Sequence, residues 1–302
     1  MPLRFYFFFV ATTLLFFFSP GQHPYFQIIA YNRELFFQKQ IQPPIVIHPI
    51  PYVQNDDEPQ ISARGAYIVE LSSFTPIYKR NPDKHFFPAS TTKIITALVA
   101  TDVYKPDDVI TVSNVAVDGH KMDLIEGEQI TAENLLYGLL VHSGNDAAYA
   151  LANYYGYEEY LKLMNMKAQK LGMKNSFFTN PAGLDNYKQK SSPFDLALAG
   201  RALVQDPYLR KMVGTKEIII SDIKYSIFHK LTNVNKLLGE IQGLGGLKTG
   251  YTENAGENLV SFYRHDDHDY LIVVMNSEDR FFDTTILVNW IKNQVRYVSI
   301  SV

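Results

Sequence analysis

The stretch Phe87-Pro88-Ala89-Ser90-Thr91-Thr92-Lys93 runs directly into the apolar segment 94–100. The apolar run predicts a buried helix, and Ser90 and Lys93, three residues apart, share one face of its first turn. A serine needs a nearby base to become a nucleophile, and a buried lysine at a helix start can be that base. The same turn offers free backbone N–H groups to a developing oxyanion. Because Ser-Thr-Thr is also ordinary helix-capping sequence, this stretch alone leaves catalysis and capping both open.

The composition excludes several classes of site. The chain has 302 residues, of which 46% are hydrophobic, enough for one large domain or two modest ones. Its formal net charge of −3 argues against nucleic acid as the partner. The absence of cysteine excludes thiol catalysis, thiolate metal ligands and disulfides. We expect neither a metal nor a diffusible cofactor.

Residues 1–20 predict a signal peptide or a short membrane anchor. Residues 5–18 are almost wholly apolar and follow Arg4. This run is shorter than the roughly 20 residues of a membrane span but typical of the apolar core of a signal peptide. The stretch Ser19-Pro20-Gly21 is a weak cleavage site, so cleavage and retention as an anchor both stay open. Either way, we expect an exported, extracytoplasmic protein.

Residues 21–61 predict a Pro-rich spacer. Proline favours extended backbone and interrupts helices. The prolines concerned are Pro43, Pro44, Pro49 and Pro51. Residues 25–42 carry enough apolar side chains to pack on a membrane surface, on a partner or on the main domain, and these alternatives stay open.

Residues 62–296 predict one α+β domain. Two hairpins are expected near its ends, one from residues 66–71 and 76–80 and the other from 259–264 and 270–275. Helices between them are expected near residues 132–141, 143–155, 157–171, 193–203 and 207–213. Strands at both ends with helices between predict an antiparallel sheet made from both chain ends, with a helical subdomain between.

A last amphipathic helix is predicted at residues 279–294. Its apolar residues recur at helical spacing and form the apolar face of the helix. They are Phe282, Ile286, Leu287, Trp290 and Ile291. Earlier in the chain, Thr131 is the predicted N-cap of the helix 132–141.

Two further short motifs accompany Ser90-Thr91-Thr92-Lys93. They are Ser143-Gly144-Asn145 and Lys248-Thr249-Gly250. Taken alone, the first fits a capping box and the second fits many strand ends. The three together, in this order, form the motif set of β-lactamases and penicillin-binding proteins. The joint pattern therefore favours catalysis.

With these motifs in place, the chain resembles the low-molecular-mass penicillin-binding proteins, the serine D-alanyl-D-alanine carboxypeptidases of peptidase family S11. The resemblance covers roughly residues 62–295 and implies a β-lactamase/DD-peptidase-like catalytic domain. Further stretches of the family's form are 136–148, 179–185, 233–238, 246–252 and 255–256. Against the pattern of many members, we expect neither their C-terminal β-domain nor their membrane-binding helix in this chain, and its long N-terminal spacer is a second departure.

The resemblance implies a role for each catalytic residue. Ser90 would attack the carbonyl between two terminal D-alanines and form an acyl-enzyme. Lys93 would be the general base, and Ser143 would relay the proton to the leaving amine. Asn145 would hydrogen-bond the substrate backbone and steady Lys93. Lys248 would keep Lys93 neutral and attract the anionic peptide end.

The remaining assignments concern substrate binding. Thr249 would bind the terminal carboxylate, and Gly250 would let an extended peptide lie against the strand. The N–H groups of Ser90 and Tyr251 would form the oxyanion hole. Arg280 occupies the place of a carboxylate-binding arginine, although a solvated charge at a helix start explains it equally well.

The predicted activity is removal of the terminal D-alanine from peptidoglycan stem peptides, with β-lactams as covalent inhibitors that acylate Ser90. A D,D-endopeptidase of the same family and a catalytically idle penicillin-binding scaffold remain alternatives. A class A β-lactamase is disfavoured because the loop 180–185 supplies no glutamate for deacylation. The cluster 265–269 contains two histidines and three aspartates, but a polar hairpin loop explains it better than a metal site. His142, beside Ser143, is expected to be a packed histidine.

Overall fold

The computed structural model describes residues 3–18, 49–55 and 57–298. Residues 3–18 form helix α1, Leu3–Phe18, whose side chains from Phe5 to Val10 are exposed. No helix among the described residues has both the length and the apolar character to cross a membrane. Residues 25–42 of the predicted spacer lie outside the described residues.

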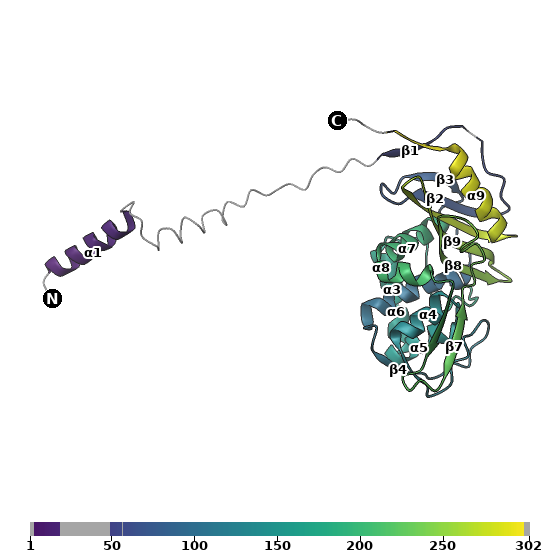
Figure 1. Cartoon of the computed structure of the whole chain (residues 1–302), viewed down its shortest axis with the longest axis horizontal. Helices are drawn as coiled ribbons and strands as arrows, with labels where there is room; N and C mark the ends of the chain where they lie inside the picture. The colour runs from purple at the N-terminus through teal and green to yellow at the C-terminus, as the bar shows by residue number, and fades with distance from the viewer. Residues whose placement is uncertain (1–2, 19–48, 56, 299–302) are drawn as a thin grey trace. The chain divides into compact units, whose positions relative to one another are not determined.

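The sheet has five antiparallel strands in the order β3-β2-β10-β9-β8. Their bounds are β2 Gly65–Glu70, β3 Pro76–Arg80, β8 Leu244–Thr252, β9 Gly256–His265 and β10 His268–Ser277. The N-terminal hairpin pairs with β10, with Ile68 opposite Ile272. The predicted α+β class and the antiparallel sheet built from both ends of the domain are therefore confirmed (Figure 1).

The central strands are buried on both faces. In β2, Tyr67 and Val69 pack into the core shared with the helices, whereas Ala66 and Ile68 pack into a smaller core with helix α9, Arg280–Gln294. Successive strand residues point to opposite faces, so a sheet covered on both sides needs continuous apolar runs. The run 66–69 meets that need.

Helix α9 confirms only part of the predicted apolar face. Leu287 and Ile291 are buried, but Phe282 is 64% exposed, and that prediction was wrong. Asp283 takes the sheet-facing position at the helix start, where its carboxylate accepts from the backbone N–H groups of Ser62 and Ala63. Phe282 is the residue before Asp283. Adjacent residues of a helix point in different directions, so Phe282 faces solvent when Asp283 is buried.

A strand β1, Ile50–Val53, pairs antiparallel with β11, Val295–Val298. In addition, Trp290 donates its indole N–H to the carbonyl of Asp57 at 2.7 Å. Both contacts come from residues that we predicted to be spacer. This part of the chain therefore packs on the same unit as residues 62–296.

The helical subdomain lies between the two halves of the sheet in sequence. It begins with a 3₁₀ turn, η1, and contains six helices and two small two-stranded antiparallel sheets. Their bounds are η1 Ala89–Thr92, α3 Lys93–Val103, β4 Val109–Thr111, β5 Gln129–Thr131, α4 Ala132–Leu140, α5 Asn145–Tyr155, α6 Tyr157–Lys170, α7 Pro193–Gln205, α8 Pro207–Val213, β6 Glu217–Ser221 and β7 Phe228–Thr232. Thr131 caps α4 as predicted, since its hydroxyl accepts from the N–H of Asn134.

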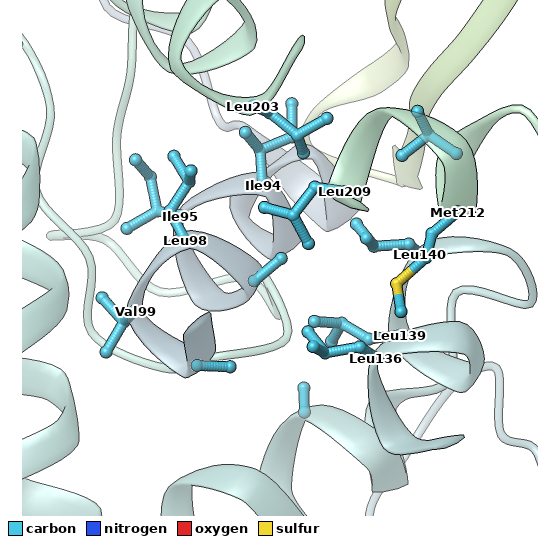
Figure 2. Close-up of a cluster of buried hydrophobic side chains, with 14 of the residues drawn as sticks. Ile94, Ile95, Leu98, Val99, Leu136, Leu139, Leu140, Leu203, Leu209 and Met212 are labelled. Atoms are coloured by element: carbon cyan, nitrogen blue, oxygen red, sulfur yellow. The ribbon is translucent and has the colours of Figure 1, made fainter. Parts of the chain in front are cut away.

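Helix α3 is the centre of this subdomain. Every side chain from Lys93 to Ala100 is buried, as expected for a helix that is apolar all round. Figure 2 shows its residues surrounded by side chains of α4, α7 and α8, among them Leu136, Leu203 and Leu209. Full burial of each such side chain contributes about 1.5–3 kcal/mol. The core therefore holds the helix that carries Lys93 in a fixed position.

Candidate active site

The predicted nucleophile and base are in contact. Ser90 lies in the 3₁₀ turn η1 and Lys93 is the first residue of α3, so the pair spans the junction rather than one regular helical turn. Lys93 Nζ lies 2.8 Å from Ser90 Oγ. The backbone of this turn packs directly against the loop 180–185. Only glycine fits at position 183, because a Cβ there would collide with the carbonyl of Ala89.

The other partners of Lys93 determine where its protons lie. Its Nζ is 2.7 Å from Asn145 Oδ1 and 2.8 Å from the carbonyl oxygen of Ala182. Both oxygens can only accept, so they use two N–H bonds. A neutral amine has two N–H bonds and one lone pair, and the lone pair is then left for the hydroxyl of Ser90. The geometry therefore suits a lysine that takes the proton of Ser90.

Electrostatics favour that neutral form. Complete burial lowers the pKa of Lys93 well below its ordinary value, the positive charge of Lys248 lowers it further, and Asp146 opposes both. A buried cation loses its hydration, and a neighbouring cation repels it. Burial and the charge of Lys248 thus shift the pKa of Lys93 in the direction that a general base at neutral pH requires.

A second serine–lysine pair faces the first. Lys248, on strand β8, places its Nζ 2.8 Å from Ser143 Oγ and 3.2 Å from the carbonyl of Thr249. Burial, and then the charge of Arg280, lower the pKa of Lys248 to about 7. The predicted convergence of residues 90, 93, 143 and 248 is present in the structure.

Ser143 is not the cap of a helix. Its φ of +64° lies in the left-handed region, which L-residues rarely adopt, and the N-cap of α5 is Gly144 with no side-chain cap. The capping-box interpretation of this motif was therefore wrong. The left-handed conformation costs on the order of 1–3 kcal/mol and is typical of functional sites. Here it belongs to the residue that contacts Lys248.

Asn145 is held on both sides of its amide. Its Oδ1 accepts from Lys93, and its Nδ2 donates to the carbonyl of Asp118 at 2.6 Å. Its backbone N–H donates to the carbonyl of His120 at 2.7 Å. The side chain is buried, so these contacts fix which end of the amide faces Lys93.

Among the described strands, β8 lies at the edge of the sheet and pairs with β9 alone. Its Lys248 contacts Ser143, and the side chain of the neighbouring Thr249 is buried as well. A Cβ on Gly250 would lie 3.0 Å from both the carbonyl oxygen of Pro88 and the nitrogen of Ser90. We predicted that Gly250 makes room for a substrate peptide, whereas the close approach that the structure shows is to the chain's own nucleophile turn.

Tyr251 and Arg280 lie at the far end of this strand. Tyr251 follows Gly250, and its side chain is 60% exposed. Arg280, the first residue of α9, donates from Nη1 to the carbonyl of Gly250 at 3.0 Å, and its Nε lies 4.0 Å from Glu257. Arg280 therefore supports β8 next to Thr249, and its charge reaches Lys248.

The sequence interpretation missed three contributors. The carbonyl of Ala182 and the carbonyl of Asp118 act through backbone atoms, which leave no residue-type signal. His120 was missed as well. Its carbonyl accepts from the N–H of Asn145, and its ring lies 4.4 Å from that of His142, centroid to centroid. Partial burial lowers the pKa of His120, and His142 and Lys248 lower it further.

The cluster 265–269 forms a hairpin, as predicted. His265 pairs with His268 across β9 and β10, and residues 266–267 make the turn. Within residues 3–18, 49–55 and 57–298, no three histidine, aspartate or glutamate side chains are grouped so that they could hold a metal ion.

Comparison with known proteins agrees with this geometry. The family profile of D-alanyl-D-alanine carboxypeptidases, peptidase S11, matches residues 52–279. D-alanyl-D-alanine carboxypeptidase DacF of Bacillus subtilis is 34% identical over 202 residues, which cover 64% of this chain and 52% of that protein. DacC of Escherichia coli is 33% identical over 258 residues, which cover 78% of this chain and 63% of that protein.

The solved structures agree with the sequence comparison. The DD-transpeptidase of Streptomyces K15 superposes with a TM-score of 0.73 at 29% identity, over 78% of this chain and 98% of that chain. The chain spans between half and two thirds of the length of DacF and DacC. The matched family, the shared fold and the two serine–lysine pairs lead to one conclusion: the chain belongs to the D-alanyl-D-alanine carboxypeptidase family, peptidase S11.

Proposed function

We propose that this protein is a serine-type D-alanyl-D-alanine carboxypeptidase that removes the terminal D-alanine from peptidoglycan stem peptides. The observation that carries the proposal is the arrangement at Lys93. Two acceptor oxygens, of Asn145 and Ala182, use its N–H bonds and leave its lone pair beside Ser90. Membership in the family supplies the substrate class.

In the first half-reaction, Ser90 Oγ attacks the carbonyl carbon between the two terminal D-alanines while Lys93 takes the hydroxyl proton. The tetrahedral oxyanion lies between the N–H groups of Ser90 and Tyr251. As the C–N bond breaks, a proton passes to the leaving amine through Ser143, whose hydroxyl contacts Lys248. Free D-alanine leaves and an ester on Ser90 remains.

In the second half-reaction, water attacks the ester carbonyl and Lys93 accepts its proton. The C–O bond to Ser90 breaks, and the hydroxyl recovers a proton from the lysine. The shortened stem peptide leaves with a free carboxylate. The enzyme returns to its starting state without any redox partner.

Substrate binding uses the open edge of β8. An extended peptide end adds to this edge by β-augmentation, with its backbone beside Gly250. Thr249 donates to the terminal carboxylate, and Lys248 and Arg280 supply positive charge around it. β-Lactams enter the same position and acylate Ser90.

The cell envelope is the compartment that fits this substrate. The apolar run at residues 5–18 serves export, as a signal peptide or as a short anchor. Immunoblotting of the mature protein after fractionation tests this point, since a cleaved product lacks residues 1–20 and an anchored one retains them.

Incubation of the purified protein with a stem pentapeptide and with cross-linked muropeptide dimers tests the activity. We expect free D-alanine from the pentapeptide, and none from Ser90→Ala. Conversion of dimers to monomers without release of D-alanine indicates a D,D-endopeptidase instead. Rapid turnover of penicillin without an adduct indicates a β-lactamase. Absence of both activities and of any penicillin adduct indicates an idle scaffold.

A further inference from the structure

A long connection without helix or strand, residues 112–128, joins β4 to β5 and reaches the active site. It supplies the carbonyls of Asp118 and His120 that fix Asn145. Long connections of this kind inside compact domains are usually functional. The position of Asn145 therefore depends on what holds this connection in place.

The connection is held at Met122. The backbone N–H of Met122 donates to both carboxylate oxygens of Asp146 at 3.1 Å, and the N–H of Leu124 donates to the same carboxylate at 3.0 Å. The carbonyl of Met122 accepts from Nδ1 of His229 at 3.0 Å. The thioether of Met122 is buried against Gly138, where a side chain would collide with it. The backbone N–H, the backbone carbonyl and the side chain of Met122 are thus all held in place.

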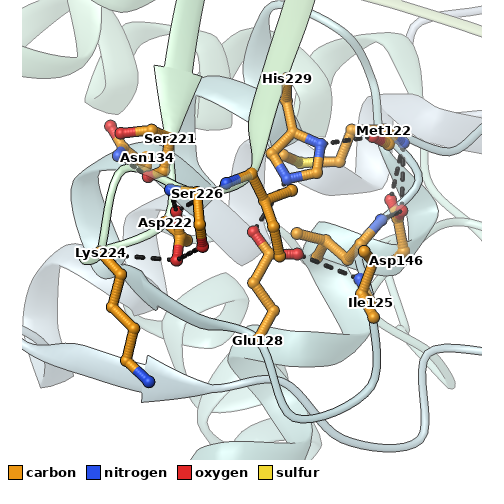
Figure 3. A network of polar contacts seen from close by, with 12 residues as sticks. Met122, Ile125, Glu128, Asn134, Asp146, Ser221, Asp222, Lys224, Ser226 and His229 are labelled. Carbon is orange, nitrogen blue, oxygen red and sulfur yellow. Dashed lines mark hydrogen bonds and ion pairs between the residues drawn. The ribbon is translucent and has the colours of Figure 1, made fainter.

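His229 is itself held by a buried carboxylate. Its Nε2 lies 2.8 Å from Glu128 Oε1, and Glu128 Oε2 accepts from the N–H of Ile125 at 3.0 Å. Figure 3 shows the ring of His229 between Glu128 and Met122, with Asp146 on the far side of the connection. A carbonyl can only accept, so Nδ1 carries the hydrogen that Met122 accepts, and Nε2 is the ring nitrogen that contacts Glu128. The pair therefore fixes both the tautomer and the direction of the ring.

We propose that His229, oriented by Glu128, is a positioning residue for catalysis. Its Nδ1–H holds the carbonyl of Met122, which holds the connection 112–128 and so keeps Asn145 against Lys93. This inference rests on the proposed function, because it concerns the acylation of Ser90. It assigns a catalytic consequence to a histidine on β7, a hairpin that carries none of the three sequence motifs.

Two substitutions of His229 separate its two ring nitrogens. In His229→Asn, the amide Nδ2 lies near the place of Nδ1 and keeps a donor for the carbonyl of Met122. In His229→Gln, the amide lies near the place of Nε2 and keeps a donor for Glu128, while Met122 loses its partner. We expect His229→Gln to lower the second-order rate constant for acylation by fluorescent penicillin about 10- to 100-fold, the cost of a small misplacement. His229→Asn should stay within about threefold of wild type on the same reasoning.

A double-mutant cycle distinguishes positioning from general stability. If His229 acts through Asn145, His229→Gln causes no further loss of acylation rate in the Asn145→Ala background. An equal loss in both backgrounds, or equal rates for His229→Gln and His229→Asn, overturns the proposal. Rates are taken well below the thermal midpoint of each variant, so that unfolding does not contribute.

Two further variants complete the test. Glu128→Gln can donate to Nε2 and still accept from Ile125, so it should retain acylation. Asp222→Ala removes the carboxylate that accepts from the N–H groups of Ser226 and Ile227 in the turn of the same hairpin. It should lower the thermal midpoint without slowing acylation, and slowing equal to that of His229→Gln overturns the proposal. Failure of the wild type to be labelled at all contradicts the proposed function instead.

Discussion

The two serine–lysine pairs have the same contact distance and different chemistry. Ser90–Lys93 and Ser143–Lys248 each meet at 2.8 Å, and both lysines are completely buried. Lys93, however, also donates to two oxygens that can only accept, those of Asn145 and Ala182, whereas Lys248 also donates to one, the carbonyl of Thr249. Burial and then a neighbouring cation lower the pKa of both lysines, well below the ordinary value for Lys93 and to about 7 for Lys248. These partners leave the lone pair of a neutral Lys93 to Ser90, so they, rather than the contact distance, support the assignment of Lys93 as the base and Lys248 as the cation.

Of the substitutions in the two pairs, removal of the base Lys93 should have the largest effect on the acylation rate. We expect Lys93→Met to lower the acylation rate by about 10³- to 10⁴-fold, because Ser90 then keeps its proton. Stopped-flow labelling with fluorescent penicillin measures the effect. A variant that is acylated within tenfold of wild type shows that another group is the base.

Removing the cation should cost less and act differently. We expect Lys248→Met to lower kcat/KM for a pentapeptide by about 10²- to 10³-fold, through loss of charge stabilisation. The pKa of Lys93 rises when the repelling charge of Lys248 is removed, so the acid limb of the rate profile moves to higher pH. Lys248→Arg keeps the charge and serves as the control. An unmoved acid limb in Lys248→Met contradicts the coupling of the two lysines.

Contact between β8 and the nucleophile turn can be broken at Gly250. In Gly250→Ala the methyl group meets Pro88 and Ser90 at 3.0 Å, so we expect about 1–3 kcal/mol of destabilisation and slower acylation. Gly245→Ala is a matched control on the same strand, because its methyl group meets only the ring of Phe262. Denaturant unfolding and penicillin labelling measure the two effects. Equal acylation rates in both variants contradict the role of this contact.

The smallest effect concerns Arg280. Its charge helps to lower the pKa of Lys248 to about 7, so Arg280→Gln should raise that pKa. Lys248 is charged below its pKa, and activity that needs this charge is lost as pH rises through it. The alkaline limb of the pentapeptide profile therefore moves to higher pH in Arg280→Gln and stays in place in Arg280→Lys. Movement to lower pH contradicts the assignment of that limb to Lys248.

The sequence predicted what depends on local spacing. The contact between Ser90 and Lys93 follows from three residues of separation, and the hairpins follow from alternation and turns. Ser143 and Lys248, 105 residues apart, could be joined only through the motif set as a whole. Resemblance to a family, rather than physical chemistry of the chain, predicted that contact.

The sequence could not predict what depends on backbone atoms and on three-dimensional packing. The carbonyl of Ala182 has no residue-type signal. The sequence at Ser143 fitted a capping box, and only the structure shows that this residue has a left-handed φ instead. Phe282 fitted an apolar face until Asp283 proved to be the anchor of α9. His229 is one histidine among several, and only the fold brings it to Met122.

Mapping the residue that penicillin acylates tests the central claim most directly, because two serines each contact a lysine. Benzylpenicillin opens its ring without losing atoms, so intact-protein mass spectrometry should show the addition of one whole molecule. Peptide mapping should place it on Ser90 in the wild type and in Ser143→Ala, and Ser90→Ala should show no adduct. An adduct in Ser90→Ala, or one on Ser143, would contradict the division into base and cation.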